Sequence, residues 1–139
     1  MSNSSYQILI ALNKQLATMA DLPSLVFYED SFDATIPSSD QTFLVAHDMQ
    51  TGVNSPVVAA GGYEEDNGIY QVSIFTPKSG NAIAAKKLAD NIKAVFGRGE
   101  LLDAGASKMR FRKVEAGSGG NENGNHYMLP VSVFWSVVG

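Results

Sequence analysis

One stretch of the chain restricts the fold more than any other, because a strand-like segment there is followed closely by an amphipathic helix. Residues 69–75 read Ile-Tyr-Gln-Val-Ser-Ile-Phe, and apolar side chains on both faces are typical of a strand inside a sheet. Pro77 ends this strand. A helix is predicted to begin at Ser79 or Gly80, with Gly97 as its left-handed terminator. The sequence therefore predicts a helix packed against a sheet.

A second amphipathic helix is predicted at residues 4–19, before any strand. Ser4 and Gln7 have the spacing of a capping box. The end of the helix is expected where Pro23 pushes the preceding residue out of the helical region. The apolar stripe of this helix consists of Leu9, Leu12, Leu16 and Met19.

The remaining segments complete an α+β fold. Periodicity weakens from Asp48 to Asn67, where we expect a long excursion with room for one extra strand, and the Gly/Asn-rich segment from Glu115 to Asn125 predicts a flexible hairpin tip. We expect one domain over residues 1–139, a mostly antiparallel β-sheet with two amphipathic helices packed against it and long loops or hairpin extensions. Further strands are predicted at 24–28, 42–47, 108–114 and 126–138.

Composition excludes several classes of protein. The chain has 139 residues, of which 45% are hydrophobic, enough for a core in a domain of this size. The net charge of −4 has the wrong sign for a protein that mainly grips phosphates, and there is no cysteine for a disulfide, a thiol nucleophile or a zinc ribbon. Only 17% of residues are charged, against about 25% in an average domain.

No targeting or membrane segment is expected. Apolar runs such as residues 8–12 are short, and the first five residues carry no basic side chain. A membrane span needs about 20 apolar residues, and a signal peptide begins with positive charge. The sequence therefore predicts a soluble protein made inside a cell.

The histidines give weak support for catalysis. His47 and Asp48 are the one adjacent pair of histidine and carboxylate in the chain, and such a pair could orient a general base. Neighbouring residues of a strand point to opposite faces, however, so a hydrogen-bonded dyad would need a bulge. His126 is interpreted as a turn residue at the end of the hairpin tip, and no enzyme is predicted.

Cofactor motifs are equally weak. Glu64-Glu65-Asp66-Asn67-Gly68 resembles half of a calcium loop but lacks the alternating ligands and the distal glutamate. Gly97-Arg98-Gly99 follows a helix instead of opening one, and Gly117-Ser118-Gly119-Gly120 has no lysine of a phosphate loop. We therefore expect no metal ion and no cofactor.

Basic residues gather on one predicted strand. Lys108, Arg110 and Arg112 alternate along one face, with Lys113 beside them and with Met109 and Phe111 on the opposite face. This face could be a plain solvated surface or a patch that meets acidic groups or phosphates. The chain supplies acidic candidates itself, and complementary patches on one subunit favour head-to-tail contacts between copies. Those acidic residues are Glu29, Asp30, Asp33, Glu64, Glu65 and Asp66.

The order of these motifs resembles that of the phage tail terminator family. The pattern is the tyrosine-bearing strand of residues 68–77, the Ala/Asp-rich helix of residues 84–96 that ends in phenylalanine, and the Arg98-Gly99 exit. Residues 129–133 also look like the last strand of that family. The resemblance does not extend over about residues 29–67. In this segment Pro37 comes later than the proline of the family's pattern.

The resemblance implies a structural virion protein that is not an enzyme. Members of this family form a ring, generally a hexamer, at the neck end of a siphophage tail. There the ring stops growth of the tail tube and joins the tail to the head. The implied partners are further copies of the chain, the tail tube protein and a connector or neck protein, while genomic DNA passes through the ring without specific binding. Assembly would take place in the host cytoplasm, without a membrane or cofactor.

On this basis, the candidate interface residues are Glu64, Glu65, Asp66, Lys108, Arg110 and Arg112. The segments 48–67 and 115–125 are expected to be mobile alone and ordered in the assembly. The alternatives are a small α+β module that binds nucleic acid or a ligand through the basic strand, and another neck or minor tail protein.

Overall fold

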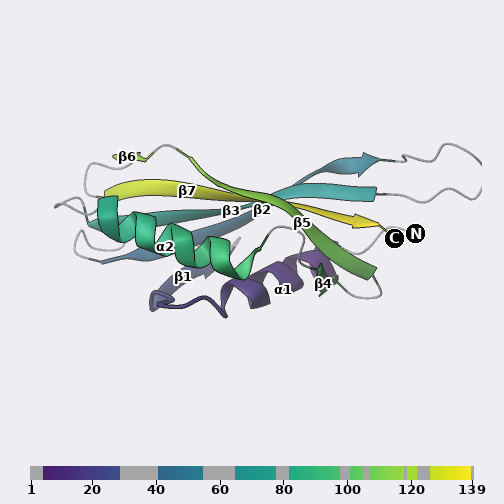
Figure 1. The fold of residues 1–139 in the computed structure, drawn as a ribbon, viewed down its shortest axis with the longest axis horizontal. Helices are drawn as coiled ribbons and strands as arrows, with labels where there is room; N and C mark the ends of the chain where they lie inside the picture. Colours follow the sequence, from purple (N-terminus) through teal and green to yellow (C-terminus); the bar gives the residue numbers. More distant parts are fainter. Residues whose placement is uncertain are drawn as a thin grey trace, which may run out of the picture.

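Helices and strands follow one another in nearly the predicted order (Figure 1). The computed structural model describes residues 5–28, 41–54, 65–77, 82–97, 101–104, 107–117, 119–121 and 126–138. The helices are α1 (Ser5–Leu16) and α2 (Ala82–Val95). The strands are β1 (Leu25–Tyr28), β2 (Phe43–Asn54), β3 (Glu65–Pro77), β4 (Leu101–Ala104), β5 (Ser107–Ala116), β6 (Gly120–Asn121) and β7 (His126–Val138).

All seven of these strands belong to one sheet within the described part of the chain. The order across the sheet is β1-β2-β3-β7-β5-β4, and β6 pairs with β7. The β1–β2 pair is parallel, whereas every other pair is antiparallel. β3 lies in the interior, as the apolar residues on both of its faces predict. The mostly antiparallel α+β fold expected from the sequence is confirmed.

Both helices pack on the same face of the sheet, which we call the inner face. In α1, Ile8, Leu12 and Leu16 recur every four residues and are fully buried, because this spacing places them on one side of a helix. The inner face of β3 contributes Tyr70, whose hydroxyl donates to Asn13 Oδ1 of α1 at 2.6 Å. The buried positions of α2 are Ala85, Ala89 and Ile92, followed by Phe96 just beyond its end.

The first helix ends earlier than predicted. It ends at Leu16 instead of residue 19, because the amides of Thr18 and Met19 bond to carbonyls three residues back. The Thr18 hydroxyl also donates to the carbonyl of Gln15 at 2.7 Å, which competes with continuation of the helix. Asp21 then adopts a left-handed conformation with φ of 59°, so the chain turns before it reaches Pro23.

Two predicted loops are shorter than expected because strand pairing extends into them. β2 continues to Asn54 and β3 begins at Glu65, so both ends of the predicted 48–67 excursion are strand, and a bulge between Gln50 and Gly52 absorbs the irregular sequence. The middle of that excursion, residues 55–64, lies outside the described residues.

The predicted hairpin tip also contains regular structure. Glu115 and Ala116 remain in β5, the Gly117 amide donates to the carbonyl of Pro130 at 2.8 Å, and β6 pairs with the start of β7. Residues 118 and 122–125 of this tip are outside the described residues. β4 was not predicted; it forms by pairing of Leu101–Ala104 with the first residues of β5.

Candidate interaction surface

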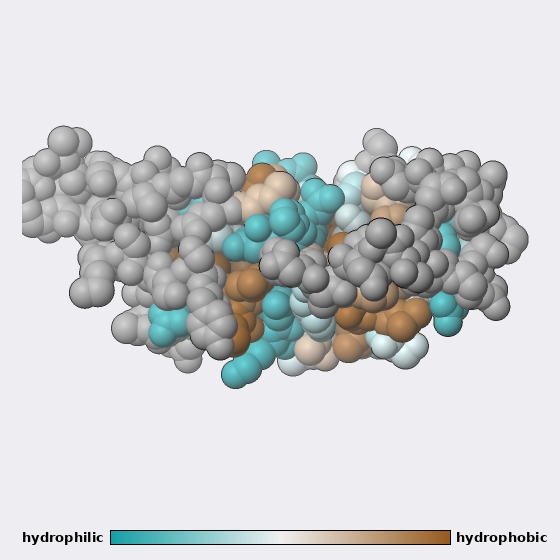
Figure 2. Space-filling model, turned by 180° about the vertical axis from the view of Figure 1, so that it is seen from behind, coloured by the Kyte–Doolittle hydropathy of each residue, from teal (hydrophilic) through white to brown (hydrophobic). Residues whose placement is uncertain are grey.

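The face of the sheet that the helices leave uncovered, which we call the outer face, is mixed in character. In β3 the fully buried Tyr70, Val72 and Ile74 alternate with half-buried Gln71 and Ser73, as the two faces of a strand require. Figure 2, which is not confined to the outer face, shows the molecule from behind, with hydrophobic side chains on both sides of a hydrophilic band in its described part. A mixture of this kind is common to protein surfaces and interfaces, so a site on this face has to be argued from particular residues.

A β-bulge in β5 decides how the basic residues are displayed. Phe111 pairs with Trp135, but Lys113 pairs with the next residue of β7, Phe134, so Arg112 is an extra residue. A bulge of this kind breaks the strict alternation of a strand. Arg112 and Lys113 are therefore both exposed although they are neighbours in the chain.

The predicted alternation holds in the described residues Met109, Arg110 and Phe111, and the bulge interrupts it at Arg112. Arg110 is exposed while Met109 and Phe111 are buried, as the sequence pattern requires. Lys113, which the sequence placed beside this face, joins Arg112 on the exposed side because of the bulge. Lys108 lies in β5 opposite Asp103 of β4.

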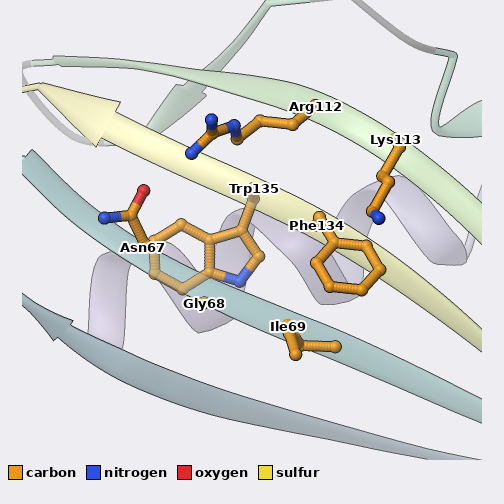
Figure 3. Close-up of a pocket in the computed structure, with 7 residues that line it drawn as sticks. All are labelled: Asn67, Gly68, Ile69, Arg112, Lys113, Phe134 and Trp135. Carbon is orange, nitrogen blue, oxygen red and sulfur yellow. The ribbon is translucent and has the colours of Figure 1, made fainter.

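The bulge borders an open depression of about 610 Å³ on the outer face (Figure 3). Arg112 and Lys113 reach from β5 over β7, and Ile69 of β3 and Phe134 of β7 supply apolar walls. The depression thus combines positive charge with apolar surface, drawn from three strands. Its lining residues are Asn67, Gly68, Ile69, Arg112, Lys113, Phe134 and Trp135.

The two cations of this depression differ in their surroundings. Lys113 Nζ lies 2.9 Å from Glu115 Oε1 and 4.6 Å from the centroid of the Phe134 ring. More than half of the Lys113 and Glu115 side chains is exposed, so this ion pair contributes little to stability. The geometry shows no ion pair of Arg112 with any residue of the described ranges, and its guanidinium can still pair with a planar carboxylate through two hydrogen bonds.

The acidic candidates are not gathered around one described site. Glu65 and Asp66 form the start of β3, just before Asn67 of the depression, and pair through the backbone with Val138 and Val137 of β7. Glu64 lies outside the described residues, as do Glu29, Asp30 and Asp33. The membership of Glu64, Glu65, Asp66, Lys108, Arg110 and Arg112 in one interface stays a prediction.

His47 and Asp48 do not form a catalytic pair. His47 is exposed and pairs with Gln71 of the outer face, whereas Asp48 belongs to the opposite face. The indole Nε1–H of Trp135 donates to Asp48 Oδ1 at 2.9 Å. The two side chains therefore point to opposite faces of the sheet, as predicted for neighbouring residues of a strand.

His126 is the first residue of β7, as the predicted strand at 126–138 requires, and its interpretation as a turn residue is wrong. It is fully buried, with its ring edge-on to Phe43 at 5.1 Å and to Phe75 at 6.3 Å between centroids. Phe43 and Phe75 are themselves stacked at 4.5 Å. This aromatic cluster stabilises one end of the outer face.

Titratable groups give no further site within the described ranges. No group of three or more acidic or histidine side chains there could hold a metal ion. Burial raises the pKa of the Tyr28 hydroxyl on β1 above its ordinary value. Among the described helices, none is long and apolar enough to span a membrane.

Comparison with known proteins identifies the family. A model of the family described as phage tail terminator protein matches residues 7–135, which is most of the chain. The chain belongs to this family. The resemblance to this family, inferred from the order of the motifs, is therefore confirmed. The members of this family are phage structural proteins.

The structural comparison agrees with this fold over nearly the whole chain. One solved structure superposes with a TM-score of 0.71, covering 96% of this chain and 95% of its own, at 21% sequence identity. At that identity the likeness concerns the fold alone. The comparison with curated proteins gave no match. Family membership supports a structural role in a phage tail, in association with other tail or head components.

Proposed function

We propose that this protein is the ring-forming terminator of a siphophage tail. The family match over residues 7–135 is the observation that supports this proposal. In this role the ring, a hexamer by analogy with the family, caps the tail tube, stops its elongation and connects the tail to the head through the neck. Its action is mechanical and requires neither catalysis nor a cofactor.

The proposed partners follow from that role. Each subunit contacts further copies of the chain, the tail tube protein on one side of the ring and a connector or neck protein on the other. Genomic DNA passes through the ring without specific binding, which agrees with the net charge of −4. The protein acts in the virion at the neck end of the tail after assembly in the host cytoplasm.

A terminator must recognise the last tube ring and yet offer no surface to which another tube subunit can add. Loops and sheet surfaces suit this task, because they vary without disturbing the core. We propose that contact specificity lies in the segments 48–67 and 115–125 and in the charged residues of β5. Residues 55–64, 118 and 122–125 of these segments lie outside the described residues.

Electron microscopy with tail tubes tests the function directly. Purified tubes of the same phage are mixed with the protein, and tube protein is then added to drive further growth. We expect a ring at one end of each tube and no further elongation at that end. Tubes that keep growing at both ends, with no ring on either, would contradict the proposal.

Charge reversal tests the part played by the basic strand. Arg110 and Arg112 are exposed on β5, so the double variant Arg110→Glu/Arg112→Glu should fold but assemble or dock on tubes less well. The matched control is Lys86→Glu/Lys87→Glu, which reverses two exposed charges on α2. Normal assembly of the β5 variant would remove these two arginines from the interface.

The same proteins distinguish the alternatives. A salt-sensitive shift of DNA mobility that disappears in the β5 variant would favour the nucleic-acid-binding module, since phosphate contacts weaken with salt. A ring that binds connector or neck protein but never tubes would favour another neck component. Neither result is expected for a terminator.

A further inference from the structure

We propose that the depression beside the β5 bulge receives the turn at Asp21 and Leu22 of a neighbouring copy, with Arg112 paired to the Asp21 carboxylate. This inference rests on the proposed function, because it assumes that copies of the chain assemble. Beyond the proposed function, it names the segment that fills the depression and the residue pair that sets the position of one copy relative to the next.

The chemistry of the depression defines what it can hold. Arg112 offers a guanidinium that makes no ion pair within the described residues, while Lys113 is already beside Glu115. Ile69 and Phe134 add apolar walls next to this charge. A carboxylate followed by an apolar side chain matches both features, because Arg binds a carboxylate through two hydrogen bonds and the walls cover apolar surface.

The turn after α1 presents this combination. Asp21 is exposed, and Leu22 is one of the exposed large hydrophobic residues of the described chain. The left-handed conformation of Asp21 shapes the turn, and Asn91 of α2 donates to the carbonyl of Ala20 at 3.1 Å. The acidic and apolar side chains are thus held on a turn that is attached to both helices.

The two surfaces lie on opposite sides of the subunit. The turn belongs to the helix-bearing side, since it follows α1 and is bonded to α2. Figure 3 views the depression with α1 behind the sheet, so the depression opens away from the helices. One copy cannot fill its own depression with this turn, whereas a second copy can. Contacts between two different patches are heterologous and close into a ring when the rotation permits.

Other occupants fit the depression less well. A nucleic acid would place phosphates next to Glu115, which already neutralises Lys113, and apolar walls offer nothing to a phosphate backbone. Glu65 and Asp66 precede Asn67 of the depression on β3 of the same copy. Asp90 of α2 is also exposed, but Asp21 is directly followed by the exposed Leu22, so we assign Asp21 to the neighbour.

A double-mutant cycle tests the pair. The variants are Arg112→Gln, Asp21→Asn and the combination, and asparagine is chosen because it tolerates the left-handed conformation. Mass photometry over a range of protein concentrations, with and without tail tubes, gives the concentration at which half of the protein is in rings. We expect each single variant to raise this concentration about tenfold and the double variant to raise it no further.

The control pair consists of Lys87→Gln and Asp90→Asn, both at exposed positions of α2, and it should leave the concentration unchanged. Independent effects that multiply to about a hundredfold in the double variant would overturn the pairing. Rings of normal stability in every variant, with defective docking on tubes, would assign the depression to the tube protein instead. Absence of wild-type rings both with and without tubes would overturn the proposed function itself.

Discussion

At the scale of single residues, Gly68 and Trp135 show how tightly the sheet is packed next to the depression. A Cβ added at Gly68 would overlap the Trp135 ring and lie 2.9 Å from the carbonyl of Met49. Trp135 cannot easily turn away, because its indole also bonds to Asp48. We therefore predict that Gly68→Ala lowers the free energy of unfolding by about 1–3 kcal/mol, measured by urea denaturation.

A second glycine provides the control for this prediction. A Cβ at Gly120 in β6 meets nothing within 4 Å, so Gly120→Ala should stay within about 0.5 kcal/mol of the wild type. Equal stability of the Gly68 and Gly120 variants would mean that the contact of Trp135 with β3 is not tight in solution.

At the scale of elements, the β5 bulge predicts different outcomes for deletion of Arg112 and deletion of Arg110. Arg112 is the extra residue of the bulge, so its deletion leaves the pairs of Phe111 with Trp135 and Lys113 with Phe134 intact. The free energy of unfolding should change by no more than about 1 kcal/mol. Thermal and urea unfolding of the deletion variant would measure this change.

Deletion of Arg110 is the matched comparison. Arg110 pairs with Ser136 in the regular part of β5, so its loss forces either Met109 or Phe111 onto the outer face. Both side chains are buried, and the deletion should cost about 3 kcal/mol or more. Similar stabilities for the two deletions would show that β5 adjusts its register freely.

These elements also show what the sequence could predict. α1, β3 and α2 carry their own periodicity, and each was located from it. The alternation of β5 is interrupted in the sequence at Arg112-Lys113, two charged residues in succession, and the structure has its bulge there. The interruption alone does not identify a bulge, because the extra residue is defined only by pairing with β7. The depression likewise joins Ile69, Lys113 and Phe134 from three strands, and no local pattern predicts which residues of distant strands become neighbours.

At the scale of the whole molecule, the low charge content agrees with the proposed assembly. Few charged residues suffice for a subunit whose surface is largely covered by neighbours. Exposed cations lie on both sides of the sheet, Arg110, Arg112 and Lys113 on β5 and Lys86, Lys87 and Lys93 on α2. The proposed head-to-tail contact therefore depends on the local match of Arg112 with Asp21 and not on a division of charge between the two sides.

Salt should therefore weaken the assembly without weakening the fold. Screening shortens the range of electrostatic attraction from about 10 Å at 0.1 M salt to about 3 Å at 1 M. We predict that this increase in NaCl raises the concentration for half-assembly about tenfold, measured by sedimentation velocity. Core packing depends on apolar contacts, so the thermal unfolding midpoint of the dilute monomer should not fall over the same range. Assembly that is insensitive to salt would mean that apolar contacts, and not the pair of Arg112 with Asp21, hold neighbouring copies together.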